Sequence, residues 1–329
     1  MKSKAGIFFT LLRVAIGIGL LVYLGRSGAM DWGALLGLAS QWPLTVASLG
    51  ILLLDLVVTS WRLCVLLAPR GFHLPVLDSS RLTLIGIFFN ACLPGATGGD
   101  LIKIYYAAEG NRGRRTEVGT IILLDRAVGL FAMVLWPLLA APFFPALIAS
   151  SGVLQFLLWA AAGLVAGLLV GWIVFAYSSL KDVGLARWAY RTLPLGAYLE
   201  RVVNTVHAYR RDGLTLLAAT GIALFAHTLS VAVILLCAQA TNPAGAAWEM
   251  SMLIPLGFLA NTLPTTPGGL GVGEAVFNQL FAIAGLSGGA AALLSWRVLT
   301  ILLSLAGLAF YLQGRQRYVH AAESAGEQS

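Results

Sequence analysis

Two short stretches rich in proline and glycine interrupt a sequence that is otherwise almost continuously apolar. Residues 93–99 read LPGATGG and residues 263–269 read LPTTPGG, and an asparagine, Asn90 or Asn261, comes shortly before each. Proline lacks the N–H donor and glycine adds backbone freedom, so neither stretch continues a helix. At membrane depth a broken backbone is tolerated only where protein buries it or water lines it. Both stretches therefore predict a protein-lined or wet site inside the membrane.

The composition favours an all-α polytopic membrane protein. The chain of 329 residues is 59% apolar and only 11% charged, which is too few charges to cover a soluble globule of this size. Six apolar stretches have the roughly 20 residues that a membrane helix needs. They are 7–26, 44–67, 119–142, 153–177, 214–238 and 290–312. We expect a single membrane domain, 1–329, with these six spans and two re-entrant helical hairpins, 80–108 and 250–284, that contain the breaks.

The distribution of basic residues predicts how these segments cross the membrane. Fifteen Lys and Arg residues fall in five connecting segments, whereas the other four segments carry only Arg26. If both hairpins return to the side from which they enter, all five basic segments lie on one face, which is typically cytoplasmic. Both termini are then cytoplasmic and the hairpins enter from opposite faces. In the alternative, the second broken stretch is two short helices that together cross more deeply.

This order of segments predicts an inverted-topology repeat. Each half runs span, span, re-entrant hairpin, span: the first over 7–142 and the second, in the opposite orientation, over 153–312. The connection 143–213 includes the fourth span and a basic, amphipathic helix in the cytoplasmic interface, and 313–329 is a cytoplasmic tail. The spacing of Leu199, Val202, Val206 and Tyr209 opposite polar residues, His207 among them, predicts that helix. This helix either links the two halves or, alternatively, recruits anionic lipid.

Two arginines near mid-membrane are the strongest candidates for a binding site. An arginine there is unfavourable by about 2.5 kcal/mol or more, so it should face a partner or a wet cavity. Adjacent helical residues point in different directions, so Asp125 pairs poorly with Arg126. Arg297 has no neighbouring carboxylate in the sequence. We favour both arginines lining one anion site; the alternative is a buried ion pair, with Asp125 or Glu274 as the partner of Arg126.

The half-helices after the two breaks aim their free N–H groups and positive dipole ends into the membrane, as discontinuous helices do in inverted-repeat transporters. The glycines there are expected to take a positive φ or to let a head group approach closely. Asp100 suits the N-cap of its half-helix, and Glu274 either pairs with an arginine or carries a proton. Lys103 either snorkels to the cytoplasmic surface or meets an acidic head group there. Asp55 and Arg62, seven residues apart, are interpreted as a structural pair.

The predicted substrate-binding residues combine the breaks with the charged and amide side chains around them. They are Asn90, Pro94, Gly98, Gly99, Asp100, Lys103, Asp125, Arg126, Asn261, Pro264, Gly268, Gly269, Glu274 and Arg297.

The residues of common catalytic and metal sites are present but are not arranged for such a role. Four histidines are scattered without metal-ligand spacing, and three cysteines lack a CxxC pair. No nucleotide-hydrolysing motif is found. The net charge of +7 comes from basic residues in short loops, which fits membrane topology better than nucleic acid. We expect no metal, no cofactor, no nucleic-acid partner and no enzymatic activity.

Three motifs carry a resemblance to a known family. Residues 90–103 (NACLPGATGGDLIK), 123–126 (LLDR) and 267–274 (PGGLGVGE) resemble the lysylphosphatidylglycerol synthase transmembrane-region family over about residues 7–312. The resemblance implies movement of a lipid or a lipid-linked head group between leaflets. Only seventeen residues follow Leu312, so we expect the stand-alone form without the aminoacyl-transferase domain, and synthase activity is not carried over. Gly273 stands where related sequences tend to have arginine.

The sequence therefore predicts a flippase-like lipid translocase in a bacterial-type plasma (inner) membrane. Its partner is a membrane lipid with an anionic head group, of the phospholipid or polyprenyl-phosphate type. Two alternatives stay open. One is a scaffold that presents lipid to a separate glycosyltransferase or synthase, and the other is an integral-membrane lipid transferase.

Overall fold

Five long helices form the body of the protein. The computed structural model describes residues 37–92, 98–109, 113–177, 196–242, 248–262, 271–313 and 320–321. Within these residues, five helices are long and apolar enough to cross a membrane: α3 (Trp42–Leu67), α6 (Arg115–Ala140), α8 (Gly152–Tyr177), α11 (Gly213–Thr241) and α14 (Gly289–Gln313). They confirm the all-α membrane fold and five of the six expected spans. The span expected at 7–26 lies outside the described residues.

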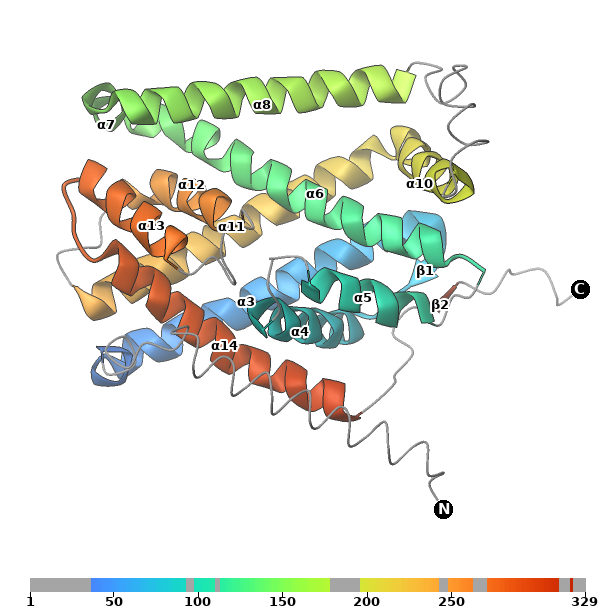
Figure 1. Ribbon diagram of the computed structural model, residues 1–329, viewed down its shortest axis with the longest axis horizontal. Helices are drawn as coiled ribbons and strands as arrows, with labels where there is room; N and C mark the ends of the chain where they lie inside the picture. Colours follow the sequence, from blue (N-terminus) through green and yellow to red (C-terminus); the bar gives the residue numbers. More distant parts are fainter. Residues whose placement is uncertain are drawn as a thin grey trace, which may run out of the picture.

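Four shorter helices form the two broken segments that the sequence predicts. They are α4 (Val76–Cys92), α5 (Gly98–Glu109), α12 (Met250–Thr262) and α13 (Val272–Ile283). Within each segment the two short helices pack against each other. The pair α4–α5 begins and ends at the end of the molecule that carries the strand β1 (Phe72–His73), whereas α12–α13 begins and ends at the opposite end (Figure 1). Each pair therefore returns to the end from which it starts.

Smaller elements connect the helices at the two ends of the bundle. They are η1 (Ala68–Arg70), η2 (Ala141–Phe143), α7 (Pro145–Ser150), α10 (Gly196–Ala208), η4 (Tyr209–Arg211) and β2 (His320–Ala321), which pairs antiparallel with β1. The helix α10, followed by η4, lies within the range expected for an interfacial helix. One detail of that expectation is wrong: His207 is buried against the ring of Phe175 rather than on a solvated face.

Basic residues gather at one end of the bundle. The end with β1 and α10 (right in Figure 1) carries the arginines Arg70, Arg81, Arg114, Arg115, Arg201, Arg210 and Arg211. The described residues of the opposite end, which include 140–152 and 283–289, contain no Lys or Arg. This is the asymmetry that the predicted topology requires of its two faces.

An aromatic and charged cluster joins three elements at the basic end. Arg70 pairs with Asp212, and its guanidinium lies 4.5 Å from the ring centroid of Tyr209. The Tyr209 hydroxyl donates to the carbonyl of Leu66 at 2.5 Å, and burial raises the pKa of this hydroxyl to about 12, so that it stays protonated. Arg114 donates to the carbonyl of Arg70 at 2.8 Å. These contacts fix the end of α3 against η4 and the start of α6.

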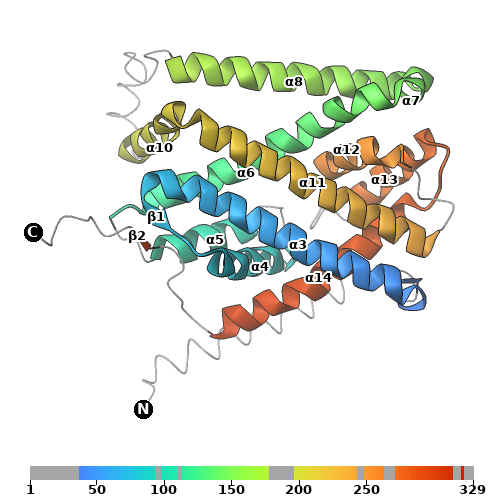
Figure 2. The same cartoon turned by 180° about the vertical axis from the view of Figure 1, so that it is seen from behind.

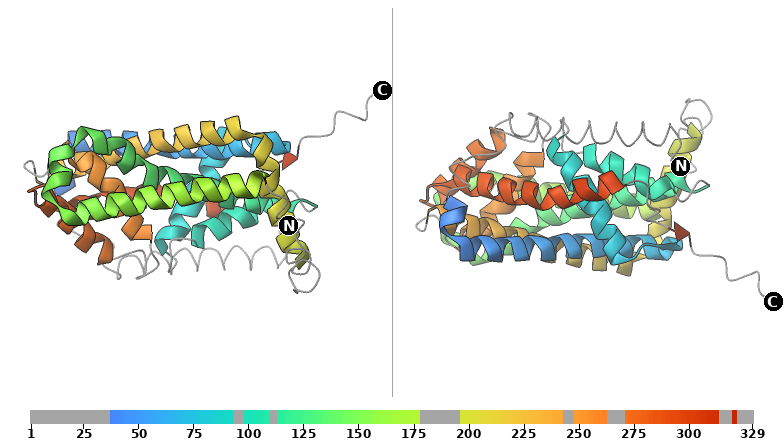
Figure 3. Two further views of the ribbon diagram at one scale, coloured as in Figure 1. Left: turned by 90° about the horizontal axis from the view of Figure 1, so that it is seen from above. Right: turned by 90° about the horizontal axis from the view of Figure 1, so that it is seen from below.

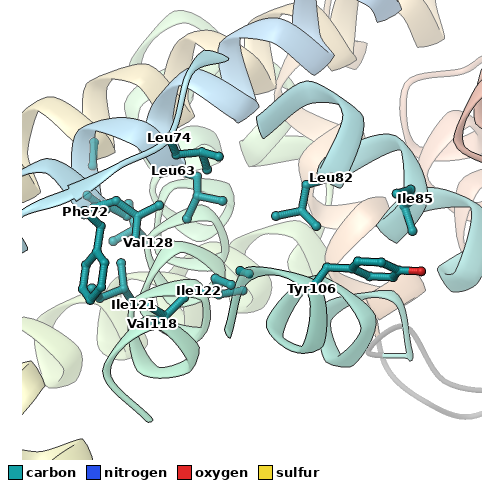
Figure 4. Close-up of a cluster of buried hydrophobic side chains, with 14 of the residues drawn as sticks. Leu63, Phe72, Leu74, Leu82, Ile85, Tyr106, Val118, Ile121, Ile122 and Val128 are labelled. Atoms are coloured by element: carbon teal, nitrogen blue, oxygen red, sulfur yellow. The ribbon is translucent and has the colours of Figure 1, made fainter. Parts of the chain in front are cut away.

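The apolar core is divided between the two halves of the chain. One cluster includes Leu63, Phe72, Leu82, Tyr106 and Ile121 from α3, β1, α4, α5 and α6 (Figure 4). A second cluster comes mainly from α8, α11, α12, α13 and α14. The long helices α3 and α11, one from each half, run side by side between them (Figure 2). Each cluster thus comes mainly from one half, and the first also takes in Ala219 and Ala223 of α11 and Ile301 of α14.

Helix α8 lies on the outside of the bundle and packs mainly against α6 (Figure 3). One side of it is buried, at Leu154, Leu158, Ala161 and Val165, while Trp159 is 78% exposed. In a membrane protein such an exposed apolar surface faces lipid, because no polar solvent has to be met there.

Candidate functional site

A cavity of about 490 Å³ lies among the helices of both halves. Its lining comes from α3, α4, α5, α6, α11, α12 and α14, and therefore from both broken helix pairs. The lining is unusually polar for the interior of so apolar a bundle. The polar side chains are Asp55, Thr59, Arg62, Thr83, Asn90, Asp100, Lys103, Asp125, Arg126, His227, Ser230, Asn261, Thr262, Arg297 and Thr300.

A buried ion pair joins α3 to α6 on one wall of this cavity. Arg62 Nε lies 2.7 Å from Asp125 Oδ1, and Arg62 Nη2 lies 3.1 Å from Asp125 Oδ2. Two parallel N–H···O bonds of this kind are the strongest arrangement that arginine and carboxylate form. The sequence interpretation of Arg62 and Asp55 as a pair is wrong, because the guanidinium takes its partner from α6.

Arg126 pairs with Asp100, which joins α6 to the start of α5. Neither Asp125 nor Glu274, the two partners considered from the sequence, plays this role. The N-cap role predicted for Asp100 is also wrong: α5 begins at Gly98, so Asp100 lies within the first turn and its carboxylate reaches across to the neighbouring helix. A carboxylate there is favoured by the helix dipole as well as by the arginine.

Arg297 has a comparable partner in the second half. Its Nε lies 3.2 Å from Glu274 Oε1, and its Nη2 donates to Asn261 Oδ1 at 2.8 Å. Glu274 Oε2 also accepts the backbone N–H of Gly271 at 2.6 Å, which satisfies a free donor at the start of α13, as the glutamate of a capping box does. Of the two roles considered for Glu274, the structure places it as the partner of an arginine.

Gly273 makes room for that guanidinium. A Cβ added at Gly273 would lie 2.6 Å from Asn261 Oδ1 and 2.8 Å from Arg297 Nη2. The space that a side chain at 273 would need is therefore filled by an arginine from α14. The positive charge at this motif is supplied by Arg297 and not by the motif itself.

Gly99 holds the two helices of the first broken segment together. Its N–H donates to Asn90 Oδ1 at 2.7 Å, and a Cβ added here would overlap the backbone carbonyl of Gly86 on α4. Gly99 is not among the described glycines with positive φ. Glycine is thus required at this position because the two helices pack closely, and not because the backbone takes an unusual conformation.

Lys103 lies inside the protein and lines the cavity. Only 8% of its surface is exposed, and its methylene groups run past Gly86, where an added Cβ would lie 2.7 Å from the lysine Cδ. The expected surface position is therefore wrong. The described residues contain no hydrogen-bond or ion-pair partner for this ammonium group. The packing of α4 against α5, and not a counter-ion, therefore sets the position of the lysine side chain.

Asp55 occupies the middle of α3, where this helix meets α11. Ser230 Oγ on α11 donates to Asp55 Oδ2 at 2.9 Å, and Thr59 Oγ1 lies 3.5 Å from Oδ1. Among the described residues it has no ion-pair partner. His227, one turn before Ser230, contacts the carbonyl of Gly129 through Nε2 at 3.0 Å.

The cavity brings together seven of the predicted site residues: Asn90, Asp100, Lys103, Asp125, Arg126, Asn261 and Arg297. Glu274 reaches them through Arg297, Gly98 begins α5, and Gly99 supports the packing behind them. Pro94, Pro264, Gly268 and Gly269 lie outside the described residues.

Sequence reasoning did not assign Asp55, Arg62, His227 or Ser230 to this site. Three of them, Asp55, Arg62 and His227, did give a signal, because an ionisable residue inside a membrane span is by default a candidate for function. In the described part of the chain, no three His, Cys, Asp or Glu side chains come together as metal ligands would. The lining instead offers N–H donors and hydroxyl groups, the chemistry that suits phosphate or carboxylate oxygens.

Comparison with known proteins identifies the family. Residues 10–307 match the family described as lysylphosphatidylglycerol synthase TM region. The chain belongs to this family. The match spans both broken helix pairs and the described long helices as far as Gly307 in α14, so the resemblance inferred from the motifs is confirmed. No curated protein and no solved structure shows significant similarity to the chain. Membership supports a function connected with membrane lipid.

Proposed function

We propose that this protein is a lipid translocase that moves an anionic or lipid-linked head group between the two leaflets of a bacterial-type plasma membrane. The observation that carries the proposal is the cavity of about 490 Å³, which is lined from both broken helix pairs and contains four cationic side chains. A head group is small and polar, whereas its acyl chains are suited to the surrounding bilayer. A polar cavity inside an apolar bundle can hold the head group while the acyl chains stay in the bilayer.

The arginines Arg126 and Arg297 are the proposed head-group ligands. Each is held by one carboxylate, from Asp100 or Glu274. A guanidinium has five N–H donors, so one carboxylate leaves donors for a second anion. The carboxylates also keep the arginines in place when the cavity is empty, because an unpaired charge inside a membrane is unfavourable. Bound phosphate would add to these pairs or replace them.

The proposed motion is alternating access between two inverted halves. Helix α4 of the first half packs against α14 of the second, and α12 of the second half packs against α6 of the first. This exchange of contacts is what a two-fold relation between the halves produces. Inverted-repeat transporters bind substrate between such halves and expose the site by rocking one against the other.

Leaflet exchange tests the proposal directly. Proteoliposomes containing the protein should move fluorescent phosphatidylglycerol between leaflets faster than protein-free liposomes. Binding of phosphatidylglycerol to Arg126→Gln or Arg297→Gln should be about tenfold to a hundredfold weaker, because each loses a charge-assisted bond of roughly 1.5–3 kcal/mol. The exposed Arg201→Gln on α10 is the matched control and should bind as the unaltered protein does.

Other outcomes support the alternatives. Lipid binding without any exchange would favour a scaffold that presents lipid to a separate glycosyltransferase or synthase, and turnover of a lipid donor would favour a transferase. If Arg126→Gln/Asp100→Asn binds phosphatidylglycerol as tightly as the unaltered protein, the arginine is only half of a structural ion pair. The cavity would then need a different ligand.

The orientation can be tested with two single cysteines at exposed positions. Arg201 lies on α10 at the basic end, and Ser287 lies between α13 and α14 at the other end. A cysteine at 201 should be labelled only from the cytoplasm and one at 287 only from outside, with the unaltered protein as the blank for its native cysteines. Labelling of both from one side would reject the proposed topology, including the cytoplasmic placement of the termini.

A further inference from the structure

The charged residues of the cavity divide into matched and unmatched groups. Three ion pairs account for five lining residues and for Glu274 behind them: Arg62 with Asp125, Arg126 with Asp100, and Arg297 with Glu274. The two that remain among the described residues are Asp55 and Lys103, and both line the cavity. With these two charged, the described site is neutral when empty.

The hydrogen-bond partners of Asp55 are hydroxyl groups, which can bond to the carboxylate and to the protonated acid alike. Its carboxylate receives hydrogen bonds from Ser230 Oγ and, more weakly, from Thr59 Oγ1. A hydroxyl group can donate to a carboxylate, and it can also turn and accept a proton from a carboxylic acid. An arginine partner, such as those of Asp100 and Asp125, favours the ionised form alone. The surroundings of Asp55 thus allow it to gain and lose a proton, whereas the arginines beside the paired carboxylates keep those carboxylates charged.

Lys103 is suited to receive a negative charge. An ammonium group has three donors and no acceptor, so only an acceptor, best of all an anion, satisfies it. It is more than nine-tenths buried, has no partner among the described residues, and lines the same cavity as the two proposed head-group arginines.

An anion bound at Lys103 gives the otherwise neutral site one net negative charge, and Asp55 is the carboxylate without an ion-pair partner among the described residues. In the low-dielectric interior, an unpaired charge is far more unfavourable than in water, and protonation is the usual way in which a buried carboxylate avoids it. One proton on Asp55 then restores neutrality. No covalent bond to the lipid forms or breaks: the proton comes from water at the open side of the cavity and leaves Asp55 on the other side.

We propose that Asp55 and Lys103 couple lipid movement to protons, with Lys103 binding one negative charge of a phosphodiester head group while Asp55 takes up one proton. This inference rests on the proposed function and deepens it by naming the charge class of the substrate and a coupling ion. Phosphatidylglycerol carries one such charge, whereas a polyprenyl monophosphate carries more. The loaded site is electrically neutral only with the first.

Other titratable groups near Asp55 define the controls. Arg62 on the same helix and Asp125 on α6 are paired with each other, and Arg126 and Arg297 are paired with Asp100 and Glu274. On α4, Asp78 and Arg81 pair with each other in the first turns of that helix and do not line the cavity. On α11, His227 faces the cavity and is the one competing proton carrier among the described residues.

The experiment measures proton uptake on lipid binding. Purified protein in weakly buffered solution is mixed with short-chain phosphatidylglycerol, and a pH-indicator dye reports protons bound. In parallel, lipid affinity is measured from about pH 5 to 8. We expect about one proton taken up per lipid bound, and an affinity that falls as the pH rises. Asp55→Asn should abolish uptake and flatten the pH dependence, and Lys103→Met should weaken binding at least tenfold.

The remaining variants separate this inference from the proposed function. Asp78→Asn, which lies outside the cavity, should retain proton uptake, and all variants are compared at matched thermal stability. Uptake that persists in Asp55→Asn, or that disappears in His227→Gln alone, overturns the coupling role of Asp55. If the unaltered protein binds and exchanges phosphatidylglycerol without proton uptake, the coupling fails and the translocase proposal stands. If it does not bind phosphatidylglycerol at any pH, the coupling is rejected together with phosphatidylglycerol as the translocated lipid.

Discussion

The two broken helix pairs follow one plan. In each, a glycine precedes an asparagine by four residues on the first short helix: Gly86 and Asn90 in α4, Gly257 and Asn261 in α12. In each, a carboxylate near the start of the second short helix pairs with an arginine of the next long helix, as Asp100 does with Arg126 and Glu274 does with Arg297.

The two pairs differ in the side chain that fills the space beside the glycine. A Cβ added at Gly86 would lie 2.7 Å from Lys103 Cδ, and one added at Gly257 would lie 2.5 Å from Phe277 Cε2. Lys103 and Phe277 each follow their carboxylate by three residues. The same packing position thus holds a cation in the first half and a fully buried ring in the second. The two broken helix pairs therefore pack alike, but among the described residues only the first places an unpaired charge at this position.

The largest effect is expected at the ion pair between Arg62 and Asp125, which has no counterpart among the described residues of the second half. Arg62→Gln leaves Asp125 charged and buried, which should lower the free energy of unfolding by about 3–5 kcal/mol. Arg62→Met/Asp125→Leu should recover most of this loss, because removing both charges removes the unpaired one. Thermal unfolding in detergent measures both. A single variant as stable as the unaltered protein would show that water reaches the pair.

The two proposed head-group arginines should respond differently to substitution. The side chain of Arg297 is 8% exposed and that of Arg126 is 27% exposed. The carboxylates left unpaired are about equally buried, at 13% for Glu274 and 14% for Asp100, so the difference lies in the arginines. Removal of the buried Arg297 in Arg297→Gln should destabilise the protein by about 3 kcal/mol. Because the Arg126 side chain is more exposed, Arg126→Gln should lower the free energy of unfolding by only about 1 kcal/mol. Equal losses of stability in the two variants would mean that the halves are equivalent at this point.

Close helix contact in the first hairpin predicts a third effect. Gly99→Ala places a methyl group against the Gly86 carbonyl, so α4 and α5 must move apart, at a cost of about 1–3 kcal/mol. Gly163→Ala on α8 meets nothing within 4 Å and serves as the matched control, with no loss expected. Unfolding temperatures report the difference. If Gly99→Ala were as stable as the control, the contact between α4 and α5 would not be tight in the native protein.

Much of the fold was accessible from the sequence, and the pairing of charges was not. Long apolar runs fixed α3 and α8 because a membrane span has a nearly invariant length. Proline and glycine marked both breaks because they remove donors and helical preference. In contrast, Arg62 and Asp125 are 63 positions apart, and no local pattern distinguishes Asp125 from Asp55 as the partner. That choice depends on how α3, α6 and α11 pack.

The site could be predicted only where its residues lie in the repeated motifs. Asn90 and Asp100 were found because they flank a break, and Arg126 because an arginine inside a membrane span needs a partner or a wet cavity. The burial of Lys103 was missed, because an exposed lysine is the usual case for a long charged side chain. Its actual position depends on Gly86, which is seventeen residues earlier and leaves a channel for the lysine methylenes. Periodicity does not reveal such a channel.

The smallest effect comes from the same substitution at the two equivalent glycines, and it is the sharpest test of the difference between the halves. In Gly86→Ala the added methyl meets the flexible stem of Lys103, which can shift, so the loss of stability should be below about 1 kcal/mol. The displaced ammonium should nevertheless weaken phosphatidylglycerol binding, by about threefold to tenfold.

Gly257→Ala should show the opposite pattern. Its methyl meets the ring of Phe277, which is fully buried and packed edge-on against Phe258, so the ring cannot move without disturbing the second core. We expect a loss of about 1–2 kcal/mol in unfolding free energy with unchanged lipid affinity. Paired measurements of unfolding and lipid binding on the two variants decide the matter. Weaker binding in Gly257→Ala but not in Gly86→Ala would place the head group against the second hairpin, and Lys103 would lose its proposed role.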